Sequence, residues 1–367
     1  MSAASGAIAE SIPCAAPAAA GTLRIDLGIF AYNEEAGIGR LLEDLARQDL
    51  CARPGIDLRV LVLANGCRDA TVARAAAAAA GLAGRLRVDI TDDPEGGKSR
   101  TWNRFVHRES RPDAEILVFM DGDIELPEPG TLGAVIDLLA ARPELTGASS
   151  QPVKDIDYRP QKLGLVERLI SMGGGTLDGE GARHAICGQF YALRGAWARG
   201  LHLPVGLPVE DGFLGAMVGT DLWSEGPRPK RMDRADGARH LYESERRMGS
   251  LLRHQTRIVI GSAINSAIFR HLSALRAREG QGAIAAELAR AAADPDWLGR
   301  VLKAELPDRR YGFVPWHFLN KRVVIFWRSG RFEPKRALVV ALGFGLDLVV
   351  WIRAQAAMAR GAGVGFW

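Results

Sequence analysis

The sequence predicts an α/β fold: a mostly parallel sheet flanked by helices, followed by a helical, partly apolar C-terminal region. Short apolar runs alternate with segments of helical spacing over residues 23–141, and this alternation is typical of a parallel sheet with helices on its faces. Turn-prone polar residues follow several of the apolar runs, as expected where strands end. After Gly147 the pattern changes, and 367 residues suffice for about two structural units.

Four strands and four helices are predicted in the first part of the chain. The helix at 36–48 places Ile38, Leu41, Leu42 and Leu45 at helical spacing. The run at 115–120 is short and continuously apolar, which indicates a strand buried on both faces. The strands are expected at 23–30, 58–63, 86–90 and 115–120, and the helices at 36–48, 72–80, 98–107 and 131–141.

The second part mixes strands and helices and then becomes mainly helical. Strands are expected at 148–153 and 185–193, on either side of a segment that contains three consecutive glycines, 173–175. A helix at 209–218 opens with Glu210 and Asp211, and the segment 228–257 carries nine Lys and Arg against four acids. We expect a disordered leader over 1–22, an α/β domain over 23–261 and a helical region over 262–367.

The last third contains three apolar stretches, at 258–269, 323–327 and 337–352. The longest is interrupted by Asp347 and is shorter than the ~20 residues needed to span a bilayer. Five of the eight Trp lie at or after Trp297, and basic residues flank the apolar runs. This combination fits an element at a membrane surface, and a buried core helix or an oligomer contact fits it equally well.

Composition and charge limit the class of protein. A net charge of +4 suits an anionic ligand or an acidic membrane surface but is too weak to indicate nucleic-acid binding. The four cysteines are scattered, without paired or zinc-like spacing, which predicts free thiols in a reducing compartment such as the cytoplasm. The leader is rich in Ala and Ser and lacks the basic and apolar segments of a secretory signal.

Asp121-Gly122-Asp123 directly follows the strand at 115–120 and is the most informative motif. Ligands of open α/β sheets bind beyond the carboxyl ends of the strands. Two carboxylates at that position can share a divalent cation and leave coordination positions for phosphate oxygens. The alternative is an ordinary Asp-Gly turn.

Three other loops after predicted strands carry candidate ligand-binding side chains. Asn33 and Glu34 follow the first strand and can face a ligand or cap the next helix. Asn65 follows the second strand and offers the donor and acceptor that a base edge needs, or forms a turn with Gly66. Lys98 follows the third strand and can contact a phosphate or remain solvated; its surroundings lack the spacing of a P-loop.

In this order, the motifs resemble those of a family 2 glycosyltransferase with the GT-A fold. The resemblance covers about residues 23–261, and the joint order of the motifs is more specific than any single one. The matching segments are Tyr32-Asn33-Glu34-Glu35, 65–71, Gly97-Lys98 with Asn103, Asp121-Gly122-Asp123, Gly188 to Arg194 (like GxxxAxR) and Glu210-Asp211 (like the ED motif).

The resemblance implies the roles of the principal residues. Asp121 and Asp123 would bind the diphosphate of a nucleotide sugar through Mg or Mn, and Asp211 would be the general base that deprotonates the acceptor hydroxyl. Such a base permits direct displacement with inversion at the anomeric carbon, while the metal stabilises the departing diphosphate. The expected substrate-binding residues are Tyr32, Asn33, Glu34, Asn65, Lys98, Asn103, Asp121, Gly188, Glu210 and Arg257.

Two departures from the family pattern qualify these expectations. Ala64 stands where the family usually has an Asp that helps to read uracil, and Asn65 can take over this role. The sequence leaves the base open, and a UDP-sugar is the expected donor. The processive QxxRW motif is reduced to His254-Gln255-Thr256-Arg257-Ile258, which keeps the Arg and lacks both the Gln and the Trp of the motif. Arg257 can still hold the diphosphate, and a single transfer is expected rather than processive synthesis.

The sequence therefore predicts an inverting glycosyltransferase that acts in the cytoplasm, at or near the inner face of the cell membrane. The expected acceptor is a hydroxyl of a glycolipid or cell-envelope polysaccharide precursor, because apolar and basic residues accumulate in the C-terminal third. Two alternatives are a sugar-phosphate nucleotidyltransferase and a non-catalytic protein that binds nucleotide sugar or membrane. His240 is a candidate for an additional metal ligand.

Overall fold

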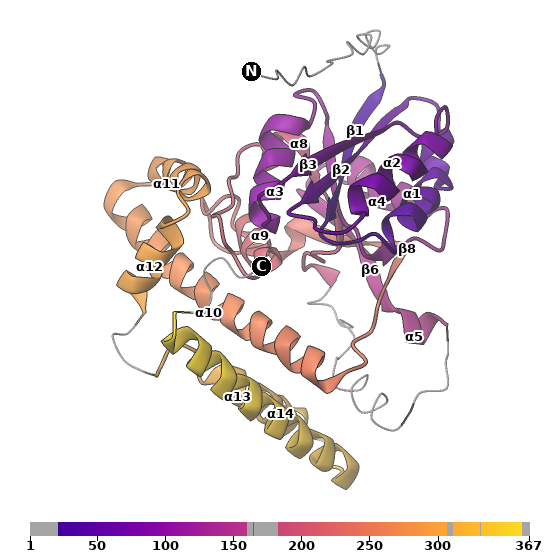
Figure 1. Ribbon diagram of the computed structural model, residues 1–367. Coiled ribbons are helices and arrows are strands. Elements are labelled where there is room, and N and C mark those ends of the chain that lie inside the picture. Colours follow the sequence, from indigo (N-terminus) through magenta and orange to yellow (C-terminus); the bar gives the residue numbers. More distant parts are fainter. Residues whose placement is uncertain (1–20, 160–163, 165–182, 307–310, 331, 362–367) are drawn as a thin grey trace, which may run out of the picture.

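The computed structural model describes residues 21–159, 164, 183–306, 311–330 and 332–361 (Figure 1). The chain forms an α/β domain built on one eight-stranded sheet, followed by a set of helices. Almost all of the predicted leader, Cys14 and the triple glycine at 173–175 lie outside the described residues.

The elements of the α/β domain alternate along the chain as expected. The strands are β1 (Leu23–Ala31), β2 (Ile56–Asn65), β3 (Val88–Asp93), β4 (Ile116–Asp121), β5 (Ile124–Glu125), β6 (Gly147–Lys154), β7 (Phe190–Arg194) and β8 (Met232–Tyr242). The helices are α1 (Ile38–Ala46), α2 (Thr71–Gly81), α3 (Lys98–Arg104), α4 (Thr131–Ala141), α5 (Asp155–Tyr158), α8 (Gly195–Ala198) and α9 (Glu210–Gly219).

The sheet has the strand order β3-β2-β1-β4-β7-β6-β8-β5. Strands β1 to β4 are parallel to one another, while β7 lies antiparallel between β4 and β6. In the register, Ala31 pairs with Ala64, and Phe30 pairs with Asp121. The loops after β1, β2 and β4 therefore leave the sheet at the same edge, where the predicted ligand-binding motifs lie.

Helices cover both faces of the sheet, and each face has its own apolar core. Val60 and Val62 of β2 pack on the side of α1, α2 and α4, whereas Leu61 and Leu63 pack on the side of α3, α9 and the long helix α10 (Met248–Glu279). All four side chains are buried. A strand buried on both faces requires the continuous apolar run seen in β2 and β4.

Strand β8 lies within the basic segment 228–257 and is the main element that sequence reasoning missed. It pairs in parallel with β6, with a register shift between Ser149 and Gln151, and in antiparallel fashion with the two-residue strand β5. Charged residues alternate with buried ones along β8, including Ala235, Ala238 and His240. Its composition hides the strand, because charged residues interrupt the apolar ones and leave neither a continuous apolar run nor a strict alternation.

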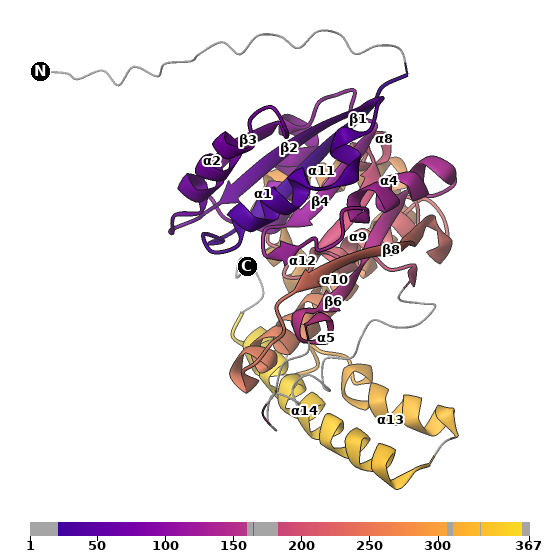
Figure 2. The same cartoon turned by 90° about the vertical axis from the view of Figure 1, so that its right-hand side faces the viewer.

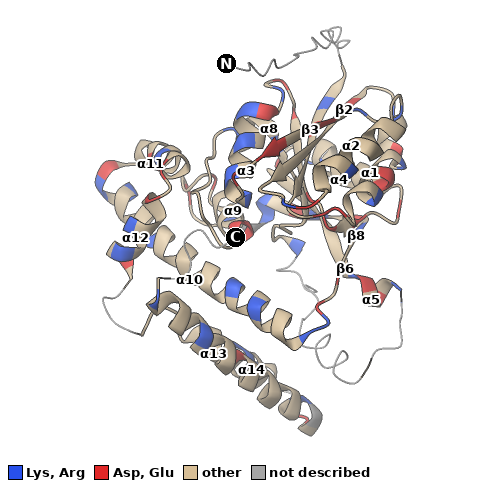
Figure 3. Ribbon diagram, in the orientation of Figure 1, with Lys and Arg blue, Asp and Glu red and all other residues tan. Residues whose placement is uncertain are grey.

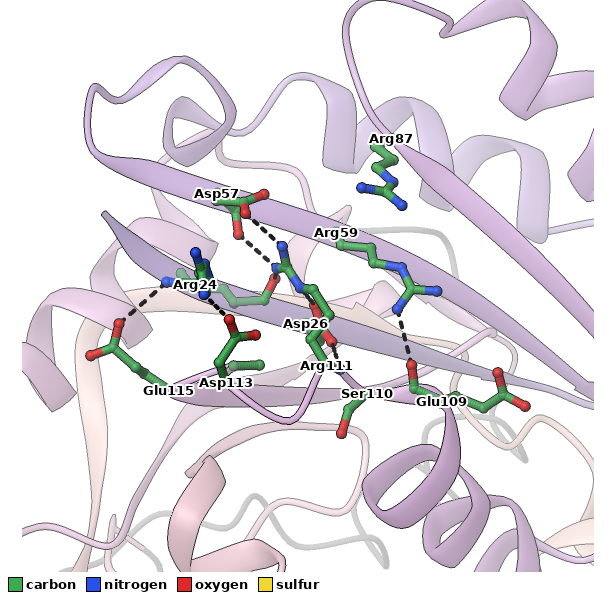
Figure 4. Close-up of polar contacts among 12 residues, drawn as sticks. Arg24, Asp26, Asp57, Arg59, Arg87, Glu109, Ser110, Arg111, Asp113 and Glu115 are labelled. Carbon is green, nitrogen blue, oxygen red and sulfur yellow. Dashed lines mark hydrogen bonds and ion pairs between the residues drawn. The ribbon is translucent and has the colours of Figure 1, made fainter. Parts of the chain in front are cut away.

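A network of ion pairs closes the opposite, amino edge of the parallel strands (Figure 4). Arg111 donates hydrogen bonds to Asp26 (2.8 Å) on β1 and to Asp57 (2.6 Å) on β2. Arg59 of β2 bonds to Asp89 of β3 and to the carbonyl of Glu109. The network joins three strands to the segment before β4, far from the candidate site.

The C-terminal part is helical, as predicted. It consists of α10, α11 (Gly282–Ala293), α12 (Trp297–Glu305), α13 (His317–Ser329) and α14 (Pro334–Ala359). The predicted domain boundary after residue 261 lies within α10, whose apolar stretch at 258–269 is largely buried; α10 packs against α9 and against the other C-terminal helices α11, α12 and α14. Among the described residues, α10 and α14 have the length and apolarity of membrane-spanning helices; the apolar window of α10 is 56% buried and that of α14 11% buried.

Candidate active site

Lys98 connects the two acidic motifs at the carboxyl edge of the sheet. Its ammonium lies 2.7 Å from Asp121 at the end of β4 and 2.8 Å from Glu210 at the start of α9, and it donates to the carbonyl of Gly188 at 3.2 Å. Burial lowers the pKa of the Lys98 ammonium, but the charges of Asp121 and Glu210 outweigh burial and hold it well above its ordinary value. Lys98 is therefore charged and brings together three elements that lie far apart in the sequence.

Three carboxylates crowd together around the Asp-Gly-Asp turn. Burial, followed by the charges of Asp123 and Asp121, raises the pKa of Glu34 to about 7. Burial raises the pKa of Asp121 to about 6, although the charge of Lys98 opposes this shift. A Cβ at Gly122 would lie 3.1 Å from Cγ of Glu34 and 3.2 Å from the carbonyl of Phe30. Glycine at this position thus allows the loop after β1 to pack against the turn.

This carboxylate cluster suits a divalent cation only in part. Asp121 and Asp123 supply hard oxygen ligands, and the unfavourable crowding of negative charge would be relieved by a cation. Within the part of the chain that the structure describes, no three His, Cys, Asp or Glu side chains are grouped closely enough to hold a metal by themselves. The remaining coordination positions are then left for phosphate oxygens and water, as is usual for Mg²⁺.

Asp211 lies in the first turn of α9, beside Gly188. Its Oδ1 accepts a hydrogen bond from its neighbour Gly212 at 2.7 Å. Burial and the charge of Glu210 raise the pKa of Asp211, opposed by the Gly212 N–H, Lys98 and Arg257. A Cβ at Gly188 would lie 3.1 Å from Cβ of Asp211. The carboxylate is therefore partly desolvated and closely packed, which are the conditions that strengthen a general base.

The loops after β1 and β2 are joined by reciprocal hydrogen bonds. Asn33, which has a positive φ of 58°, accepts a hydrogen bond from the backbone of Arg68 (2.8 Å). Glu35 accepts one from Ala70 (2.9 Å), and the backbone of Glu34 donates to Thr71 (2.7 Å). These contacts fix the two loops relative to each other, while Tyr32 next to them is 57% exposed.

Asn65 and Asn103 use their side chains to hold neighbouring segments. The Asn65 amide donates to the carbonyl of Ala31 (2.9 Å) and accepts from Gly97 (3.3 Å). The Asn103 amide both donates to and accepts from the backbone of Leu203, each at 2.8 Å. In this structure both are positioning residues, and their predicted contacts with substrate stay predictions.

His240 is buried beneath the site, with both ring nitrogens near protein partners. Its Nδ1 lies 2.5 Å from the Ser150 hydroxyl and its Nε2 3.2 Å from Oε1 of Gln189. Burial lowers the pKa of the ring to about 3, so it is neutral. Gln189, whose carbonyl accepts a hydrogen bond from the Asp121 N–H (2.9 Å), connects His240 to the acidic turn. This places His240 as a support beneath the site, and its role as a metal ligand stays a prediction.

Sequence reasoning found the acidic motifs but not the contacts between them. The ion pair of Lys98 with Glu210 joins residues more than a hundred positions apart, and no local pattern signals it. The aromatic stack of Trp102, Phe119 and Tyr191 beneath the site was also missed, with ring centroids 5.5 and 4.7 Å apart. Apolar periodicity predicts that such rings are buried and gives no information about which of them meet.

Comparisons with known proteins agree with this geometry. The model of glycosyl transferase family 2 matches residues 26–195, and no curated protein matches the chain. Among solved structures, the mannosyltransferase of Pyrobaculum calidifontis, in complex with GDP-Man and Mn²⁺, superimposes with a TM-score of 0.52 at 16% identity, over 91% of this chain and 87% of that one. Glucosyl-3-phosphoglycerate synthase from Mycobacterium tuberculosis matches at 20% identity and a TM-score of 0.43, over 66% of this chain and 79% of that one.

The family match covers most of β1 and all the strands from β2 to β7, and it includes the Asp-Gly-Asp turn, Lys98 and Gly188. The likeness to the mannosyltransferase extends over the same sheet and shows the fold. The chain therefore carries a glycosyl transferase family 2 domain with the GT-A fold, and the protein is a glycosyltransferase.

Proposed function

We propose that the protein is a metal-dependent, inverting glycosyltransferase that moves one sugar from a nucleoside-diphosphate sugar to a hydroxyl acceptor. The observation that carries the proposal is the junction at Lys98, which joins the acidic turn of β4 to the acidic start of α9. A donor-binding carboxylate pair and a candidate base then lie at one edge of the sheet. Such an arrangement suits a displacement in which leaving group and base act on opposite sides of the anomeric carbon.

The donor side of the site would be formed by the loops after β1, β2 and β4. Asp121 and Asp123 would hold Mg or Mn, which supplies charge neutralisation for the departing diphosphate. The raised pKa values of Glu34 and Asp121 support a cationic guest, because a nearby positive charge relieves the repulsion that causes part of each shift. The mannosyltransferase of the same fold was solved with GDP-Man and Mn²⁺, which supports a nucleotide sugar here; we propose a UDP-sugar as the first donor to test.

The acceptor side would be formed around Asp211. We propose that this carboxylate takes the proton of the attacking hydroxyl, and its raised pKa supports that role. Arg257 of α10, whose charge acts on Asp211, would contact the diphosphate. Tyr32, Asn33, Glu34, Asn65, Lys98, Asn103, Gly188 and Glu210 would bind the substrates or hold the groups that do.

For the acceptor we propose a glycolipid or a polysaccharide precursor of the cell envelope, glycosylated once at the cytoplasmic face of the membrane. The support is the exposed apolar surface of the C-terminal helices, among them Leu338 and Leu342, each 62% exposed. The reduced processive motif around Arg257 supports a single transfer. No part of the proposal involves nucleic acid.

The experiment that tests the function combines a binding panel with a base variant. Nucleotide sugars are screened by thermal shift with Mn²⁺, Mg²⁺ or EDTA, since a ligand of the folded state raises the melting temperature. We expect stabilisation by one nucleotide sugar only when metal is present, and Asp211→Asn should keep that shift and lose transfer by at least ~100-fold. Unchanged turnover in Asp211→Asn contradicts the base assignment.

Two further results separate the alternatives. Asp123→Ala should weaken metal-dependent donor binding, and identical affinity by calorimetry contradicts its role as a ligand. Pyrophosphate release from a nucleoside triphosphate and a sugar phosphate would instead identify a nucleotidyltransferase. Absence of any shift with every nucleotide sugar would favour a non-catalytic protein that binds membrane without nucleotide sugar.

A further inference from the structure

A pair of helices presents an unpartnered apolar face to solvent. Helices α13 and α14 pack side by side as a hairpin that projects away from the sheet (Figures 1 and 2). On α14, the exposed positions Leu338, Leu342, Gly345, Val349 and Ile352 follow one another at steps of four and three, so they form one stripe along the helix. The four large side chains of this apolar stripe are 45–62% exposed.

The opposite face of α14 is attached to the rest of the protein. Val350, Ala354 and Met358 are buried against it. The Gln355 side chain accepts a hydrogen bond from the Phe313 N–H at 3.0 Å and donates to the carbonyl of Val314 at 3.2 Å. Because its C-terminal half is held in this way, α14 cannot cross a bilayer while it keeps this packing.

The only acid of α14 is turned inward and does not interrupt the stripe. Asp347 accepts a hydrogen bond from Arg322 of α13 at 2.7 Å, and its side chain is 10% exposed. A Cβ at Gly343 would lie 2.9 Å from Cδ of Arg322, so the glycine makes room for this internal pair. The Asp that interrupts the apolar run in the sequence therefore joins the two helices of the hairpin.

The segment that contains the hairpin, residues 311–360, accounts for the net positive charge of the protein. Residues 311–360 contain eight Lys and Arg and two Asp and Glu, a net charge of +6, whereas the whole chain carries +4. The remainder of the chain is thus slightly acidic. Exposed basic residues lie along both helices of the hairpin, among them Lys321 and Arg328 on α13 and Arg336 and Arg353 on α14; Figure 3 shows the distribution of charge. Basic residues next to an apolar face are typical of binding to anionic lipid.

We propose that the α13–α14 hairpin docks on an anionic lipid bilayer and lies in its interface plane. The apolar stripe would enter the acyl boundary, while Arg328 and Arg336 would meet lipid phosphates. Exposed Trp316 and Trp327, 68% and 67% exposed, are the side chains that membrane interfaces favour. A second copy of the chain fits this surface less well, since burying two stripes together would bring two segments of charge +6 into contact.

This inference deepens the proposed function, because it supplies the surface that would bring the site to a lipid-linked acceptor. Lipid binding is measured without donor, metal or transfer. The lipid-binding proposal and the proposed glycosyltransferase function can therefore be contradicted independently of each other. The assay is co-sedimentation of the full chain with vesicles of phosphatidylcholine alone or with phosphatidylglycerol. The wild-type protein should bind the mixed vesicles and bind pure phosphatidylcholine at least ~10-fold more weakly.

Two pairs of variants locate the surface. Leu338→Glu with Leu342→Glu should weaken binding to mixed vesicles at least ~10-fold. Arg328→Glu with Arg336→Glu should weaken it by about fivefold or more per residue. The matched control is Ala285→Glu with Ala289→Glu, which places two acids at the same spacing on the exposed face of α11 and should leave binding unchanged. Circular dichroism verifies that each variant keeps its helices.

Two outcomes overturn the proposal. The first is unchanged lipid binding by the Leu338/Leu342 variant. The second is a wild-type dimer that this variant converts to a monomer with no loss of lipid binding, as measured by light scattering; the stripe would then be an interface between copies.

Discussion

At the scale of single residues, the arrangement of the site depends on Lys98. Its charge lies between Asp121 and Glu210, which belong to different elements and would otherwise repel each other. The ion pairs are partly exposed, with the Lys98 side chain at 33%, so their net contribution to stability is small. The ion pairs instead determine the geometry of the site, because they hold the start of α9 against the end of β4. Asp211 lies in that first turn of α9 and is positioned with it.

Replacing Lys98 should therefore damage catalysis more than folding. In Lys98→Met, Asp121 and Glu210 lose their shared cation and separate, and misplacement of a catalytic group by about 1 Å costs on the order of 100-fold. We expect kcat to fall by that order while the helical content stays the same. Lys98→Arg retains the charge and should recover part of the rate. Equal rates for Lys98→Met and wild type would show that the junction has no catalytic importance.

The raised pKa of Glu34 predicts that the metal-free protein becomes less stable as the pH rises. The folded protein holds the Glu34 pKa at about 7 against 4.5 in the unfolded chain, so folding takes up a proton between these values. Stability is lost as the pH rises through this window. Glu34→Gln should raise the free energy of unfolding by about 1–2 kcal/mol at pH 8, after allowance for solvent screening, and change it little at pH 4.5. Urea titrations in EDTA at both pH values measure the difference; equal effects would contradict it.

Several site residues could be predicted from the sequence, but their partners could not. Asp121, Asp123 and Asp211 follow from motif and position at strand and helix ends. Asn103 was expected to bind substrate, yet its amide meets the backbone of Leu203. An amide offers the same donor and acceptor to a ligand or to a peptide group, so residue type alone does not decide between them.

At the scale of elements, the ion network at the amino edge holds the parallel strands without taking part in the site. Asp26 is fully buried, and Arg111 is the residue that pairs with it. Removing one partner of a buried pair leaves an uncompensated charge. Arg111→Met should therefore lower the free energy of unfolding by about 3 kcal/mol, as measured by urea denaturation, with kcat unchanged at temperatures where the protein is folded. A loss below about 0.5 kcal/mol would show that Asp26 finds water or another partner.

The elements themselves were predicted well where one pattern dominates. The helix expected at 131–141 forms over those residues as α4. The strand expected at 185–193 is shorter, because the Phe190 N–H turns back to the carbonyl of Cys187 and β7 begins only at Phe190. Gly188 and Gln189 form this turn, and the apolar residues on both sides of them make the segment look like one continuous strand. β8 shows the converse, a strand whose charged residues conceal its pairing with β6.

At the scale of the whole molecule, α10 connects the catalytic edge to the C-terminal hairpin. One side of α10 meets the residue before the acidic start of α9, where Asn265 donates to the carbonyl of Val209 at 3.1 Å. The same helix also packs against α14. The position of Asp211 therefore depends on a helix that also supports the proposed lipid-binding surface. The domain boundary predicted from the sequence, after residue 261, falls inside this single continuous helix.

This arrangement makes Gly261 a sensitive position in α10. A Cβ there would lie 2.4 Å from Cγ2 of Val209, so Gly261→Ala should displace the start of α9 and lower kcat by about 10- to 100-fold. Gly249→Ala, in the same helix, meets no atom closer than 3.8 Å and should stabilise the helix by up to about 1 kcal/mol with kcat unchanged. Because alanine favours a helix at both positions, only the contact with Val209 separates the two variants. Equal kcat values for both would show that α10 does not position the base.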